Sequence, residues 1–119
     1  MPIATFALAL LLTQQPAPGT EVPVIKAGLG SCGADFTVKD TDGKAVYAAA
    51  VHVRVRYGVM SLKRMDLEVS TNSDGKATVD GLPAKSKLLV YDIQKDGKKA
   101  TAEQSVIDTC QAKHAITLK

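Results

Sequence analysis

The side chains best suited to chemistry stand close together in residues 51–57, which read Val-His-Val-Arg-Val-Arg-Tyr. Apolar and polar residues alternate, so this segment is predicted to be a strand that buries its valines and turns the other side outward. His52, Arg54 and Arg56 would then share one exposed face. A row of basic groups favours contact with an anion, such as an acidic polysaccharide, and makes this face the candidate binding face.

A second interpretation of this face requires no ligand. The next alternating segment carries Asp66 and Glu68, and opposite charges across a strand pair contribute about a few tenths of a kcal/mol each. The face would then be a solvated strand surface balanced by its neighbour. Residues 59–64, between the two segments, either continue the strand or bulge outward. Lys63 and Arg64 would add to a basic binding face if that loop projects beside it.

Residue patterns typical of catalysis are sparse. Neither His52 nor His114 lies in a motif with a serine, and the chain contains no Gly-x-Ser-x-Gly sequence. Asp66 and Glu68 alternate on one exposed face and lack the apolar surroundings that acid catalysis requires. We therefore expect no catalytic residue, no cofactor and a protein that is not an enzyme, with a small hydrolase as the weakest alternative.

A metal site is equally poorly supported. Asp40, Asp42 and Gly43 begin like a calcium-binding loop, but no glutamate follows at the spacing at which such a loop closes. A tight turn explains the same residues. We expect no metal.

Cys32 and Cys110 are the two cysteines of the chain. In an exported protein an even pair is typical of a disulfide, and this one would join the first strand region to the last. Two alternatives stay open. Residues 29–32, Leu-Gly-Ser-Cys, weakly resemble a lipidation signal, and a metal site would need further ligands.

The N-terminal residues suggest export. An apolar run within residues 1–19 has the length of a signal-peptide core and is too short to span a bilayer, although no Lys or Arg precedes it. The alternative is a buried N-terminal helix. We expect a linker over residues 20–31, a domain over residues 32–119, no stable membrane span in the mature chain, and a periplasmic or extracellular location.

Composition narrows the partners. The formal charge of +3 is spread evenly along the chain, which disfavours a nucleic-acid-binding face. Aromatic residues make up 4% of the chain and tryptophan is missing, so stacking platforms for sugars or bases are few.

The elements that would position these residues are marked by Asp-Gly-Lys, which occurs three times. Asp-Gly favours tight turns, because glycine adopts positive φ easily and aspartate tolerates it. The structural turns are therefore placed at Asp42, Gly43, Asp74, Gly75, Asp96 and Gly97. Seven strands of an antiparallel domain are predicted around them, at residues 34–39, 51–57, 65–69, 77–79, 87–93, 101–107 and 112–118.

Two motifs in series resemble the carboxypeptidase regulatory-like domain. Residues 40–53 read Asp-Thr-Asp-Gly-Lys-Ala-Val-Tyr-Ala-Ala-Ala-Val-His-Val, and residues 71–77 read Thr-Asn-Ser-Asp-Gly-Lys-Ala. A Gly-Leu-Pro bend follows at residues 81–83. The chain departs from the family at residues 85–88, Lys-Ser-Lys-Leu, where a glycine and a tyrosine are usual.

This resemblance implies an all-β fold: a seven-stranded, immunoglobulin-like (transthyretin-like, Greek-key) sandwich. It also favours a non-catalytic module that interacts with a protein or serves as an accessory at the bacterial envelope. The alternative is a module that binds a carbohydrate or another envelope polymer through His52, Arg54 and Arg56. Fold alone does not decide between these functions.

Overall fold

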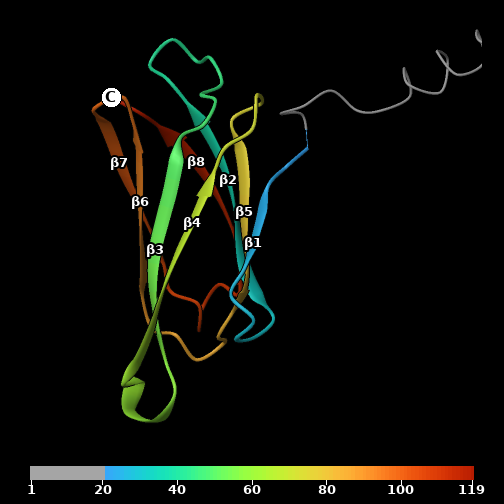
Figure 1. Ribbon diagram of the computed structural model, residues 1–119, viewed down its shortest axis with the longest axis vertical. Helices are drawn as coiled ribbons and strands as arrows, with labels where there is room; N and C mark the ends of the chain where they lie inside the picture. The colour runs from blue at the N-terminus through green and yellow to red at the C-terminus, as the bar shows by residue number, and fades with distance from the viewer. Residues whose placement is uncertain (1–20) are drawn as a thin grey trace, which may run out of the picture.

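The computed structural model describes residues 21–119, which form two β-sheets packed face to face (Figure 1). The expected signal peptide, residues 1–19, lies outside the described residues. The strands are β1 (Val24–Lys26), β2 (Cys32–Lys39), β3 (Ala50–Tyr57), β4 (Lys63–Ser70), β5 (Lys76–Leu82), β6 (Leu89–Lys95), β7 (Lys98–Gln104) and β8 (Gln111–Thr117). A short 3-10 turn, η1 (Val59–Ser61), lies between β3 and β4.

The prediction of an all-β sandwich is confirmed, but the strands number eight rather than seven. The additional strand is β1, within the segment expected to be a linker. It pairs with β5 in parallel and forms the edge of the first sheet. The two sheets have the strand orders β1-β5-β2-β8 and β4-β3-β6-β7.

The turn pattern predicted antiparallel pairing throughout, and this is wrong for part of the first sheet. β2 pairs with β8 in parallel, and β1 pairs with β5 in parallel. Parallel neighbours need a long crossover. Here the crossover passes through the second sheet, which takes up β3 and β4 and later β6 and β7.

The three Asp-Gly turns have different roles. Asp96 and Gly97 close the β6–β7 hairpin with φ of 50° and 81°, as a two-residue loop with both central residues at positive φ requires. Asp42-Gly43 and Asp74-Gly75 instead lie where the chain passes from one sheet to the other. The expected tight turn at Asp42-Gly43 does close a local antiparallel bridge between Lys39 and Ala45. The alternation of the flanking strands could not reveal that the strands on either side of these two turns belong to different sheets.

The core lies between the sheets and follows the predicted alternation. Val51, Val53 and Val55 of β3 are buried on its inner side. Phe36 of β2 and Tyr91 of β6 meet edge to face, with ring centroids 4.7 Å apart. Each fully buried aromatic ring removes a large apolar area from water, so this contact ties the two sheets together.

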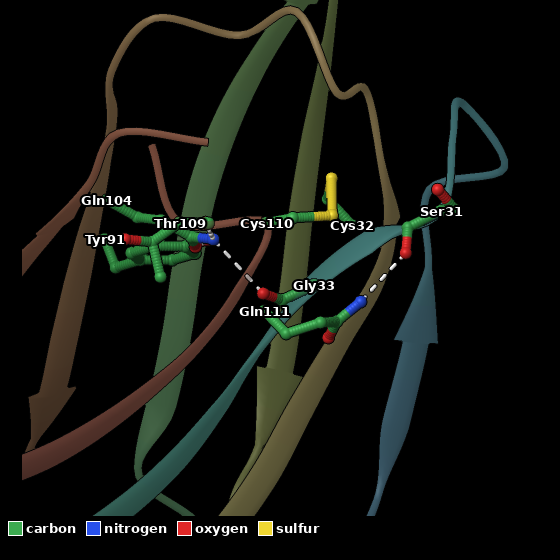
Figure 2. The surroundings of a disulfide bond; sticks show 8 residues. All are labelled: Ser31, Cys32, Gly33, Tyr91, Gln104, Thr109, Cys110 and Gln111. Carbon is green, nitrogen blue, oxygen red and sulfur yellow. Dashed lines mark hydrogen bonds between the residues drawn. A yellow bond between two sulfur atoms is a disulfide. The ribbon is translucent and has the colours of Figure 1, made fainter. Parts of the chain in front are cut away.

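The predicted disulfide is confirmed: Cys32 and Cys110 are bonded, with Cα atoms 4.7 Å apart and a sequence separation of 78. Figure 2 shows Gln104 beside this bond. Its Nε2 donates to the carbonyls of Gly33 (3.1 Å) and Thr109 (2.8 Å), and its Oε1 accepts from the Tyr91 hydroxyl at 2.6 Å. Both polar ends of this buried amide are therefore satisfied, which removes the cost of burying them.

Candidate functional site

A groove of about 1120 Å³ runs along the outer face of the second sheet, opposite the core. Its floor carries His52, Arg54 and Arg56 from β3 and Val90 and Asp92 from β6. Its sides are the loop of residues 83–88 between β5 and β6, residues 29–31, and the beginning of the β3–β4 hairpin.

The alternation of β3 places the candidate binding face in this groove. Because the valines of β3 are buried against the first sheet, the intervening basic side chains must point the other way. All three predicted residues line the groove.

Arg54 and His52 have an acidic neighbour on β4. The Arg54 Nε lies 2.9 Å from Oδ1 of Asp66, and Nε2 of His52 lies 3.5 Å from the same oxygen. The hydrogen bond from Arg54 lowers the pKa of Asp66 below its ordinary value. For these two residues the structure matches the interpretation of a charge-balanced strand surface, and exposed pairs of this kind contribute little to stability.

Arg56 is different. No ion pair of Arg56 is found within residues 21–119, and the residue directly opposite it on β4 is Arg64. Like charges opposite each other on adjacent strands are destabilising. Of the two basic residues considered from residues 59–64, the register places Arg64 beside the candidate binding face, whereas Lys63 is opposite Tyr57. An anion between the two guanidinium groups would offset their repulsion.

The remaining charges make the groove asymmetric. Lys85 and Lys87 line it on the side opposite β3. At the other end, His52 faces Asp92 of β6 and Glu68 of β4 across the strands. The groove is thus strongly cationic near Arg56 and mixed in charge near His52, while the exposed side chains of Leu88 and Val90 supply apolar surface between.

Residues 85–90 were not identified as site residues from the sequence. One signal was present, because Lys85-Ser86-Lys87-Leu88 is where the chain departs from the family pattern. The strand expected to begin at residue 87 begins at Leu89, which leaves both lysines in the loop beside the groove.

The acidic turns show no sign of a metal site. Among residues 21–119 there is no group of three or more His, Cys, Asp or Glu side chains arranged to hold a metal ion. Oδ1 of Asp40 instead accepts the backbone N–H groups of Asp42 (2.9 Å) and Lys44 (3.0 Å). The bond from Lys44 is the main cause that lowers the pKa of Asp40.

The second histidine lies in the interior. The ring of His114, on β8, stacks on Phe36 with centroids 5.1 Å apart, and its Nε2 is buried with no hydrogen-bond partner in the described structure. Burial lowers the pKa of His114 and raises that of Tyr91. His114 belongs to the first sheet and packs between the two sheets, whereas His52 is on the outer face of the second sheet. The second sheet separates them, so they cannot act on one ligand.

No protein-family model matches the chain, and no curated protein is significantly similar in sequence. The fold is similar to solved dioxygenases. Against catechol 1,2-dioxygenase from Acinetobacter sp. ADP1 the TM-score is 0.53 at 11% identity, over 98% of this chain and 67% of that one. Against the enzyme from Pseudomonas arvilla C-1 it is 0.57 at 10% identity, over 98% and 66%.

A third similar structure is the dioxygenase domain of a dioxygenase–carbohydrate-binding protein fusion from Streptomyces sp. SirexAA-E. The TM-score is 0.55 at 12% identity, over 89% of this chain and 94% of that domain. The chain thus spans about two thirds of the catechol dioxygenases and nearly all of this domain. Such low identity establishes a shared sandwich and nothing finer.

The expectation that the protein is not an enzyme is contradicted by these structures, because enzymes are built on the same sandwich. Haem, flavin, copper and non-haem iron are the groups that commonly carry chemistry with dioxygen. A metal centre does not fit the residues described in 21–119, since they hold no suitable cluster and their two histidines are separated by a sheet. We therefore derive no dioxygenase step for this chain.

The described part of the chain contains no helix of the length and hydropathy needed to cross a bilayer.

Proposed function

We propose that the protein is an exported module of the bacterial envelope that binds an acidic polymer, of the anionic polysaccharide class, in the groove along β3 and β6. The observation that carries this proposal is the pair Arg56 and Arg64, placed opposite each other without a carboxylate between them. Lys85 and Lys87 face the same end of the groove. Repeated negative charges along a polymer would meet these groups one after another.

The disulfide supports export. Disulfides persist in oxidising compartments such as the periplasm and the exterior of the cell, and they are rare in the cytosol. The Cys32–Cys110 bond and the signal-like composition of residues 1–19 agree in this respect.

The relationship to the carboxypeptidase regulatory-like domain is part of the same proposal, together with its transthyretin-like Greek-key topology. It is supported by the order of the two Asp-Gly motifs and the Gly-Leu-Pro bend along a two-sheet sandwich. In this proposal the loop of residues 83–88, whose sequence at residues 85–88 is atypical for that family, forms one side of the groove.

Co-sedimentation of the folded protein with insoluble acidic and neutral polysaccharides, at low and at high salt, tests the proposal. We expect binding to the acidic polymer alone, and weaker binding as salt rises, because ions screen the exposed arginines. The double variant Arg54→Ala, Arg56→Ala should lose it. Lys95→Ala, Lys98→Ala removes as much charge from the β6–β7 turn, at the opposite end of β3, and should bind as the wild type does.

Absence of binding to any acidic polymer at low salt would reject the proposal. Equal loss in both double variants would show a general charge effect in place of a groove. Capture of an acidic protein through Arg54 and Arg56, with no affinity for polymer, would instead identify a protein partner.

A further inference from the structure

The β3–β4 hairpin ends in an exposed apolar tip. Val59, Met60 and Leu62 are 82%, 86% and 79% exposed. In Figure 1 this hairpin projects beyond the other loops at its end of the sandwich. Isolated exposed apolar residues are ordinary, but three large ones on one projecting turn form a patch that is typical of a contact surface.

The backbone conformation of this turn directs the apolar side chains into solvent. Met60 and Ser61 have φ of 56° and 57°, the left-handed region that side chains other than glycine rarely adopt. The turn is closed by backbone bonds from Ser61 to the carbonyl of Gly58 (3.2 Å) and from Leu62 to that of Val59 (3.3 Å). No residue of the tip is buried, so the conformation presents apolar surface to the surroundings rather than to the core.

Basic residues surround the tip where the two strands begin to pair. Tyr57 is opposite Lys63, and Arg56 is opposite Arg64. The adjacent carboxylate on this face of β4 is Asp66, one outward position further from the tip. It is hydrogen-bonded to Arg54, and the charge of Arg64 acts on it more weakly. Near the tip the cations Arg56, Lys63 and Arg64 form a basic collar that outnumbers the carboxylates. An apolar end above such a collar matches the interface of an anionic bilayer, where apolar side chains enter the acyl boundary and cations meet phosphate groups.

We propose that the tip formed by residues 59–62 inserts into the surface of an anionic membrane, with Arg56, Lys63 and Arg64 at the level of the headgroups. This proposal does not rest on polymer binding in the groove. It needs no membrane-spanning segment, because a few apolar residues with a basic collar give reversible attachment.

Co-sedimentation with vesicles tests the proposal. We expect the wild type to bind vesicles of phosphatidylglycerol mixed with phosphatidylcholine, and to bind pure phosphatidylcholine at least about tenfold more weakly, since each collar cation gains from anionic lipid. Met60→Ser, Leu62→Ser should weaken binding to the anionic vesicles by about tenfold or more. Tyr47→Ser, an equally drastic change at a residue 60% exposed in the β2–β3 loop at the opposite end, should leave binding unchanged.

The collar is tested separately. Arg56→Gln, Arg64→Gln should weaken binding to anionic vesicles about tenfold, whereas Lys95→Gln, Lys98→Gln should not. Thermal unfolding of each variant confirms that it is folded. Polymer binding by Met60→Ser, Leu62→Ser should equal that of the wild type, so failure of the membrane proposal and failure of the groove proposal are distinguishable.

Three results would overturn the membrane proposal. The first is that the wild type fails to sediment with anionic vesicles at low salt. The second is that the Met60→Ser, Leu62→Ser variant sediments with them as well as the wild type does. The third is a dimer that Met60→Ser, Leu62→Ser converts to a monomer, measured by sedimentation velocity, because the tip would then be covered by a second copy of the chain.

Discussion

Burial constrains the charge state of His114, a partly buried side chain that packs against the core. Its ring contacts both Phe36 and Tyr91, and its Nε2 is buried without a partner in residues 21–119. A proton on that nitrogen would be a charge without compensation, so burial lowers its pKa below the ordinary 6.5. The folded protein therefore keeps the ring neutral at a pH where the unfolded chain protonates it.

This linkage predicts a loss of stability in mild acid. The contribution of His114 is complete above about pH 6.5 and is lost as pH falls towards the lower pKa of the folded state, by at most about 1.4 kcal/mol per pH unit for one proton. His114→Phe, which keeps an aromatic ring, should flatten the decline in the free energy of unfolding between about pH 7 and about pH 5. Urea unfolding at several pH values measures it.

His52→Gln, on the exposed outer face, is the matched control. It should show the same decline in the free energy of unfolding between about pH 7 and about pH 5 as the wild type does. If the wild type and His114→Phe lose stability equally over this range, the buried ring is not its source.

At the scale of elements, the sequence predicted the strands better than their partners. Local alternation placed residues 51–57 and 65–69 correctly, and the inward valines of β3 followed from it. Asp96-Gly97 was correctly predicted to close a hairpin. The parallel pairing of β2 with β8 could not be predicted, because it depends on which sheet each strand joins and no local pattern records that choice.

The candidate site was predictable only where it depends on local alternation. The outward face of β3 followed from its alternation, whereas Lys85 and Lys87 reach the groove through the path of the β5–β6 loop. The apolar tip was visible as Val-Met-Ser-Leu in the sequence, but its exposure depends on the left-handed backbone of Met60 and Ser61.

Two glycines in the turns between the sheets provide a matched pair of substitutions. Gly43 and Gly75 have φ of 81° and 74°, so alanine is strained at both. A Cβ at Gly43 would meet no atom within 4 Å, whereas one at Gly75 would collide with the carbonyl oxygen of Val38. We expect Gly43→Ala to cost about 1 to 2 kcal/mol and Gly75→Ala to cost about 1 to 3 kcal/mol more, since the turn must also move away from β2.

Chemical denaturation of the two variants measures this difference. Equal losses would show that the turn at Gly75 shifts without cost, and that its packing on β2 does not matter to the fold.

At the scale of the whole molecule, the disulfide joins the beginning of the domain to its end. It closes a loop with a sequence separation of 78. In the chain-entropy model such a crosslink stabilises the folded state by about 4.5 kcal/mol. Cys32→Ala, Cys110→Ala should therefore lower the free energy of unfolding by about 3 to 5 kcal/mol, measured by urea denaturation without reductant.

Reduction of the wild type with a thiol should have the same effect as the double variant. A loss below about 1 kcal/mol would mean that the bonds of Gln104 to Gly33, Thr109 and Tyr91 hold the two ends together without the crosslink.

Binding of an acidic polysaccharide in the groove along β3 and β6 is tested most directly by mapping where such a ligand contacts the protein. The two-dimensional NMR spectrum of the labelled protein is recorded during titration with a soluble acidic oligosaccharide and with a neutral one. We expect shifts at Arg54, Arg56, Lys85, Lys87 and Val90 with the acidic oligosaccharide alone. Shifts confined to other faces of the sandwich, or equal shifts with both oligosaccharides, would contradict the claim.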